Sequence, residues 1–125
     1  MRTQYHFRNS PLGLCAWDVR RLIQLSNGFG RELVPLSAIR ELDEPYWAGA
    51  PSQQLTCRQV VDHARLMLDC DLAFPVILSS DGRVMDGMHR ICKALLEGHT
   101  EIEAVRFAQD PEPDYAGINP DDLPY

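Results

Sequence analysis

The segment at 74–98 constrains the fold more than any other part of the chain. It contains, in order, an apolar run at 74–78, an Asp-Gly turn at 79–82, a short apolar run at 83–85, and a helix-like apolar pattern at 88–97. An Asp-Gly pair favours the left-handed conformations of a tight hairpin turn, and a glycine such as Gly98 commonly ends a helix. This order predicts a β-hairpin that leads directly into a helix, which is typical of a small mixed α/β domain.

Turn residues and apolar periodicity predict further elements on both sides of this segment. They indicate a helix at 17–26, a strand at 32–36, one helical turn capped by Ser37, an ordered loop at 43–54, a helix from its cap Thr56 to Asp69, and a strand at 101–107. The helix after Thr56 is expected to have an apolar face, formed by Val60, Val61, Ala64, Leu66, Met67 and Leu68. The prediction is one α/β (α+β) domain at 1–125, with a small mixed sheet and packed helices. Its proline-rich acidic tail at 108–125 is expected to wrap the surface or partly fray.

Composition and charge narrow the class of protein. The 125 residues suit one domain, and their formal net charge is −6. A domain that binds duplex DNA by itself usually carries a basic stripe. The arginines of this chain are scattered, so autonomous DNA binding is not expected. A local basic pocket for one small anion is still compatible with this charge pattern. No apolar stretch has the length of a membrane span, and the first residues lack a signal-peptide core, so we expect a cytoplasmic protein without a membrane partner. The four cysteines form no CxxC pair, and we expect most of them to be buried free thiols.

The clearest candidate chemistry lies at the junction of strand and helix, in Asp86-Gly87-Met88-His89-Arg90. Glycine lets the backbone turn sharply and lets a ligand come close, and the free amides and dipole of the helix start attract anions. Arg90 can add paired hydrogen bonds to phosphate oxygens, and His89 is a donor whose charge changes near neutral pH. Asp86 could brace the loop, accept a hydroxyl proton or help to hold a cation. The alternative stays open that these residues are only a helix cap, an exposed first-turn side chain and a surface ion-pair partner.

The order of elements resembles the core of the ParB/sulfiredoxin-like superfamily. The resemblance is carried by the span 74–107, FPVILSSDGRVMDGMHRICKALLEGHTEIEAVRF. Members have a strand pair, a Gly-x-His-Arg or Gly-x-Arg-Arg turn, a helix with alanine near Ala94, and a final strand. The strand at 34–36 and the helix after Thr56 fit the same plan. The resemblance therefore covers about 33–107 and leaves an N-terminal extension at 1–32 and the tail outside it.

The resemblance implies that the turn binds nucleotide phosphates, as CTP is bound in partition proteins, ATP in sulfiredoxins and ADP in free-serine kinases. Gly87, His89 and Arg90 match the phosphate turn of the family. Sulfiredoxins place a reactive cysteine where this chain has Met88, and a thioether cannot act as a thiolate nucleophile, so sulfinic-acid reduction is not expected. The helix-turn-helix domain and dimerisation segment of partition proteins are not found in the sequence either, so a complete partition role is not expected.

Two more groups of residues are candidates through the same resemblance. The helix after Thr56 supplies further polar contacts in the family, which makes second-rank ligand candidates of Arg58, Asp62, His63 and Arg65. Kinase relatives use a loop carboxylate as a base on the substrate hydroxyl, and the candidates here are Asp43 and Glu44, together with Glu41. The alternatives are a solvated helix face and solvated loop charge. Tyr46 and Trp47 either stack on a base or form a hydrophobic flap over the core.

These patterns lead to one expected function and two alternatives. The expected function is binding of a nucleotide, ATP, ADP or CTP with Mg²⁺, with hydrolysis or phosphoryl transfer to a small hydroxyl substrate as a further possibility. In that case Asp86, Asp43 and Glu44 are the candidate catalytic residues. The alternatives are a non-enzymatic regulatory or adaptor module and a DNA-associated partition or nuclease-type factor. The sequence leaves open whether the protein is an enzyme, which partner it has, and its oligomeric state.

Overall fold

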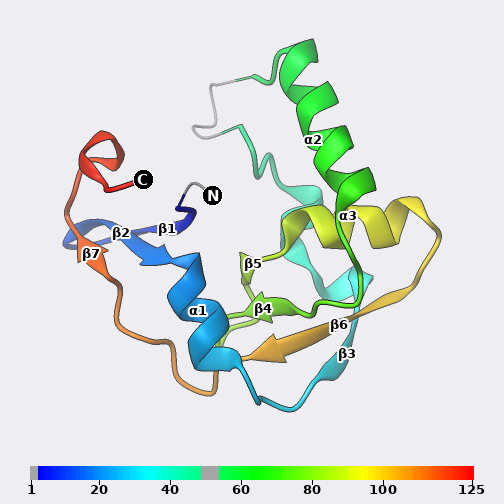
Figure 1. Ribbon diagram of the computed structural model, residues 1–125, viewed down its shortest axis with the longest axis horizontal. Helices are drawn as coiled ribbons and strands as arrows, with labels where there is room; N and C mark the ends of the chain where they lie inside the picture. Colours follow the sequence, from blue (N-terminus) through cyan, green and yellow to red (C-terminus); the bar gives the residue numbers. More distant parts are fainter. Residues whose placement is uncertain (1–2, 49–53) are drawn as a thin grey trace.

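A four-stranded mixed sheet forms the framework of the structure, a computed structural model that describes residues 3–48 and 54–125 (Figure 1). Its strands lie in the order β3 (Glu32–Pro35), β6 (Glu101–Arg106), β4 (Val76–Leu78) and β5 (Val84–Asp86). β4 is parallel to β6, whereas the β3–β6 and β4–β5 pairs are antiparallel. These pairings confirm the predicted mixed sheet and the α+β fold class.

Apolar layers cover both faces of this sheet. α3 (Met88–Leu96) packs on one face, where its Ile91 and Ala94 join a core cluster with residues of β3, β4 and β6. α1 (Val19–Ser26) and the N-terminal strand β2 (Gly13–Asp18) cover the other face and form a second cluster. Successive side chains of a strand point to opposite faces, so Ala104 of β6 belongs to the first cluster and Val105 to the second.

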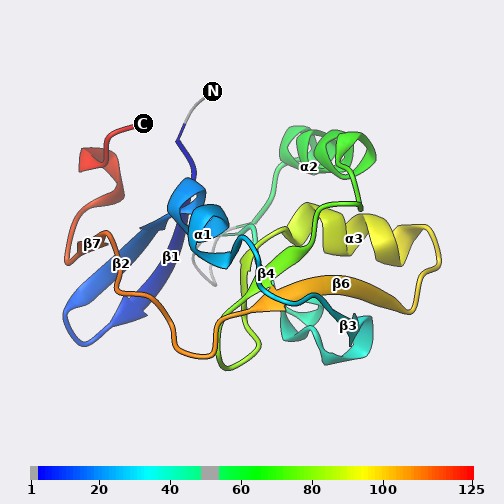
Figure 2. The ribbon, with the colours of Figure 1, turned by 60° about the horizontal axis from the view of Figure 1, so that its bottom comes forward.

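α2 (Cys57–Asp69) begins where the sequence predicts. The Thr56 hydroxyl accepts the Gln59 amide, and the Gln59 side chain accepts the Thr56 amide, which together make a capping box. α2 lies outside α3, farther from the sheet (Figure 2). Since α3 already covers the sheet, α2 has only the outer side of α3 to pack against.

The apolar side chains predicted on α2 are not buried in the core. No residue of α2 is buried, and Val60, Val61 and Leu68 are 52%, 54% and 64% exposed. The apolar periodicity of the segment correctly indicates a helix, but it does not indicate which side of the helix meets the rest of the chain.

The first eighteen residues hold a hairpin that the sequence patterns do not predict. β1 (Tyr5–Ser10) pairs with β2, and β7 (Tyr115–Ala116) adds to the free edge of β2, which makes a separate three-stranded sheet. The helix expected from residue 17 begins at Val19 because residues 17–18 belong to β2. The Asp18 side chain caps the helix by accepting the Arg20 amide at 2.9 Å.

The acidic tail wraps the surface, as one of the two predictions for it states. The Trp17 indole N–H donates to the Pro111 carbonyl at 2.8 Å, and Arg21 lies 3.3 Å from a carboxylate oxygen of Asp114. Near the end of the chain, a short 3-10 helix at Pro120–Asp122 precedes the buried Leu123. These contacts hold the tail against the N-terminal sheet, beside which it runs in Figure 1.

Smaller differences from the predicted elements have local causes. The single turn expected after Ser37 is two 3-10 helices, Leu36–Ala38 and Arg40–Asp43, and Ser37 caps neither of them. β4 begins at Val76 instead of residue 74. Of the loop predicted at 43–54, residues 49–53 lie outside the described residues. No helix among the described residues is both long and apolar enough to cross a membrane.

Candidate functional site

A cleft of about 700 Å³ lies between the N-terminal hairpin and the turn that begins α3. One wall is residues 4–9 of the hairpin strand, and the opposite wall is residues 85–89. The remaining side is closed by Tyr46 and Trp47 of the loop before α2 and by Leu66 of α2. The cleft is within the size range of small-molecule sites, and the predicted phosphate turn opens into it.

Gly87 gives the turn its shape. Its φ of +108° lies in the left-handed region that favours glycine, and a Cβ at this position would lie 2.7 Å from Cγ1 of Val76. Gly87 is also the N-cap of α3, and no side chain caps the helix start. The first amides of α3 are therefore available to a ligand. Met88 contributes its amide only, because its side chain is buried in the core.

The structure separates the two side chains that were expected to bind one anion together. His89 lines the 700 Å³ cleft, whereas Arg90 lines a neighbouring cavity of about 460 Å³. Arg90 donates to the Asp86 carboxylate at 2.9 Å and to the Pro75 carbonyl at 3.2 Å, and it is largely buried. Asp86 lines both cavities. The Asp86–Arg90 pair thus forms the partition between them and braces the turn.

Two histidines and a tryptophan form an aromatic group beside the turn. Nδ1 of His63 and Nε2 of His89 are 2.9 Å apart, so one ring must donate and the other accept. The Trp47 indole lies nearly parallel to both imidazoles, with ring centroids 4.2 Å from His63 and 4.7 Å from His89. Burial lowers the pKa of His63; burial and then the neighbouring His63 lower the pKa of His89, against a smaller opposing effect of Asp86. Near neutral pH the pair is therefore uncharged in the free protein.

The other predicted ligand residues of α2 lie elsewhere. Arg58, Asp62 and Arg65 are exposed. They line neither the 700 Å³ cleft nor the cavities of about 460 and 380 Å³ found among the described residues. They occupy a side of α2 turned away from His63. Of the four α2 candidates, the structure brings only His63 to the turn.

The two loop carboxylates proposed as bases are also outside the cleft. Glu44 accepts two hydrogen bonds from the Arg83 guanidinium, at 2.9 and 2.7 Å, which lower the pKa of its carboxyl and make it a weaker base. It lines a third cavity of about 380 Å³, and Asp43 is exposed and lines none of the three. Asp86 is the one carboxylate among the described residues that line the 700 Å³ cleft.

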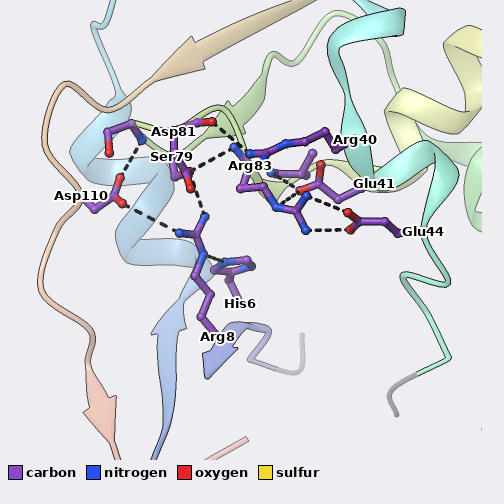
Figure 3. Close-up of polar contacts among 11 residues, drawn as sticks. His6, Arg8, Arg40, Glu41, Glu44, Ser79, Asp81, Arg83 and Asp110 are labelled. Atoms are coloured by element: carbon purple, nitrogen blue, oxygen red, sulfur yellow. Dashed lines mark hydrogen bonds and ion pairs between the residues drawn. The ribbon is translucent and has the colours of Figure 1, made fainter. Parts of the chain in front are cut away.

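Glu41 has a structural position that the sequence patterns do not reveal. Its side chain is 3% exposed, one carboxylate oxygen accepts the Val84 amide at 2.6 Å, and the same oxygen lies 3.5 Å from Nε of Arg83 (Figure 3). Glu41 therefore connects the 3-10 helix Arg40–Asp43 to strand β5. This contact positions the loop that carries Trp47.

The sequence patterns do not predict His6 and Arg8 of β1 as site residues, although residues 5–8 alternate between apolar and polar side chains as in a strand. Nε of Arg8 donates to the His6 ring at 3.0 Å, and the guanidinium lies 3.9 Å from both Asp81 and Asp110 (Figure 3). Asp110 also accepts the Ser80 amide at 2.7 Å. The guanidinium nitrogen nearest Asp81 is buried and has no hydrogen-bond partner among the described residues. This network ties the hairpin to the β4–β5 turn and places a cation in the cleft wall.

The cysteines and the possible metal ligands of the described residues do not form a metal site. All four thiols are free, as predicted, but only Cys15 is buried, and Cys57 is exposed at the start of α2. No group of three or more His, Cys, Asp or Glu side chains in the described ranges could hold a metal ion. A Mg²⁺ ion at this site would therefore have to be held mainly by the phosphates of a ligand.

The comparisons with known proteins add no relative. No protein-family model, no curated protein and no solved structure matched the chain. The site is therefore interpreted from its own geometry.

Proposed function

We propose that the protein binds a phosphate-bearing small molecule of the nucleotide class in the 700 Å³ cleft, with a phosphate at the first amides of α3. The observation that carries the proposal is the uncapped helix start behind Gly87, which faces an open cleft beside the His89 ring. Backbone amides and the helix dipole together favour an anion at such a position. The strand–glycine–helix order also agrees with the resemblance to the ParB/sulfiredoxin-like superfamily.

Side chains around the turn support the same ligand class. Arg8 on the opposite wall places a guanidinium, paired with Asp81 and Asp110, along the cleft, and His89 supplies a ring nitrogen. Tyr46 and Trp47 line the cleft and offer apolar surface to a base or ribose. Arg90 acts indirectly in this proposal, because its pairing with Asp86 holds the turn.

Binding is better supported than turnover. Asp86 is the carboxylate available in the described cleft wall, and it is paired with Arg90. A general base must reach the proton that it accepts, and Glu44 is held by Arg83 outside the cleft. A regulatory or adaptor role without turnover is therefore the second candidate.

Calorimetric titration with ATP, ADP, CTP and inorganic phosphate, each with and without Mg²⁺, tests the proposal. We expect at least one nucleotide to bind and His89→Ala to weaken that binding about tenfold, the equivalent of one hydrogen bond to a charged group. His99→Ala is the matched control, because His99 is an exposed histidine just beyond the other end of α3. Absence of binding heat for every ligand, or equal affinities for the two variants, would overturn the proposal. Release of inorganic phosphate in the same mixtures would distinguish an enzyme from a binder.

A further inference from the structure

A stripe of apolar side chains on α2 faces solvent. Val60, Val61, Ala64 and Leu68 lie on one side of the helix because residues three and four apart share a face. All four are exposed, and Val60, Val61 and Leu68 are each more than half exposed. α2 uses a different side to contact α3, where His63 meets His89. Apolar side chains gathered on one exposed face of a helix make a candidate interaction surface.

A row of charges borders this stripe along one edge. Its members are Arg58, Asp62, Arg65 and Asp69, spaced four, three and four residues apart, so they follow one line along the helix. Their signs alternate from the N-terminal to the C-terminal end. Within the described residues none of the four forms an ion pair, and all are exposed. Their charges are therefore available to a partner.

We propose that α2 packs antiparallel against α2 of a second copy of this chain, with the two apolar stripes in contact. A two-fold axis beside Ala64 reverses the direction of the helix and places the same edge of both copies side by side. Read in reverse, the charge row is complementary to itself: Arg58 comes opposite the partner's Asp69, and Arg65 comes opposite the partner's Asp62. A parallel two-fold pair would instead place the two charge rows on opposite edges of the contact, where they could not pair with each other. The order of the charges thus favours a second copy of this chain as the partner of α2 and an antiparallel direction for the two helices.

The size of the surface sets the expected strength. Thirteen residues of helix span about 20 Å at 1.5 Å per residue, so the contact is smaller than the ~800 Å² per partner of stable complexes. We therefore expect a reversible dimer with a dissociation constant in the micromolar range, about 10 to 100 µM. The stripe and the nucleotide cleft use different sides of α2, so this inference does not depend on the proposed function.

Sedimentation equilibrium of the full chain from about 1 to 300 µM tests the dimer. The weight-average mass of the wild type should rise from one chain toward two. Val61→Glu, which places a charge in the stripe at an exposed position, should keep the protein monomeric throughout this range. Leu12→Glu, at a position 79% exposed in the β1–β2 turn, is the matched control and should dimerise like the wild type. A wild type that stays monomeric, or a Val61→Glu variant that dimerises normally, would overturn the proposal.

A charge reversal tests the antiparallel direction. Arg65→Asp faces the partner's Asp62 with a like charge and should weaken the dimer by roughly fivefold or more, while Asp62→Arg combined with Arg65→Asp should restore it. Melting temperatures of the monomer, measured at low concentration, separate this result from a change within the helix. Cys57 supplies a second readout, because antiparallel helices place the two Cys57 residues about 20 Å apart. Rapid Cys57–Cys57 disulfide formation under mild oxidation, or failure of the double reversal to restore dimerisation, would overturn the antiparallel arrangement.

Discussion

The His6 ring should make the stability of this protein depend on pH in a measurable way. Burial and the adjacent Arg8 guanidinium lower the pKa of His6 from 6.5 to about 4. The ring accepts a hydrogen bond from Arg8 in its neutral form, and protonation would place two cations side by side. As the pH falls below 6.5, His6 therefore becomes protonated in the unfolded chain but stays neutral in the folded protein down to about pH 4. The free energy of unfolding decreases over this range because only the unfolded state gains the proton.

The magnitude follows from the size of the pKa shift. Each pKa unit corresponds to about 1.4 kcal/mol, so the complete shift is worth about 3 kcal/mol. Between about pH 7.5 and pH 5, where the folded ring stays neutral, the loss should be about 2 kcal/mol. Urea unfolding at a series of pH values measures this loss directly.

A variant that cannot titrate isolates the contribution of His6. His6→Gln keeps an oxygen that can accept the Arg8 hydrogen bond but has no ionisable ring. The wild-type stability should fall by about 2 kcal/mol relative to this variant over the same pH range, because all other titrating groups are shared. Equal pH dependence in the two proteins, or an NMR titration midpoint of His6 near 6.5, would refute the reasoning.

Three further predictions concern the turn, the loop clamp and the ligand. Gly87→Ala places alanine in a left-handed conformation with its Cβ 2.7 Å from Val76. The free energy of unfolding, measured by urea denaturation, should fall by about 2–4 kcal/mol, and a change below about 0.5 kcal/mol would contradict this. Glu41→Ala leaves the buried Val84 amide without its partner and should cost about 1–3 kcal/mol in the same assay, whereas Glu103→Ala, at an exposed carboxylate, should cost less than about 0.5 kcal/mol. The histidine pair at the turn is uncharged in the free protein, so a bound anion should raise the pKa of the pair and bind several-fold more tightly at about pH 6 than at about pH 8. Calorimetry in buffers of different ionisation enthalpy should show that binding takes up a proton. An affinity independent of pH would contradict this role of the histidines.

The sequence predicts the core of this fold well because local signals and burial agree there. The Asp-Gly hairpin, Gly87 and the helix up to residue 96 all appear, since turn chemistry fixes the backbone and the apolar residues of α3 have a sheet to cover. The capping box at Thr56 likewise sets the start of α2. Each of these signals lies within a few residues of the structure that it determines.

Features that depend on distant contacts could not be predicted in this way. The β1–β2 hairpin is stabilised by β7 from the opposite end of the chain, and its turn at residues 11–12 lacks an Asp-Gly or Asn-Gly pair. The outward stripe of α2 follows from α3 having already covered the sheet. At the site, the motif correctly identifies a glycine turn at a helix start, but only the tertiary structure shows that Arg90 pairs with Asp86 and that His63 and Trp47 join His89.

The most direct test of the central claim is an amide-resolved NMR titration of the full chain with the nucleotide that binds in calorimetry. The proposal predicts that the largest shifts occur at the amides of Gly87, Met88 and His89, because a phosphate would accept hydrogen bonds there. The amides of the exposed α2 stripe should remain unchanged at a concentration where the protein is monomeric. Saturable binding that leaves the three turn amides unshifted would contradict the claim that the start of α3 is the phosphate site.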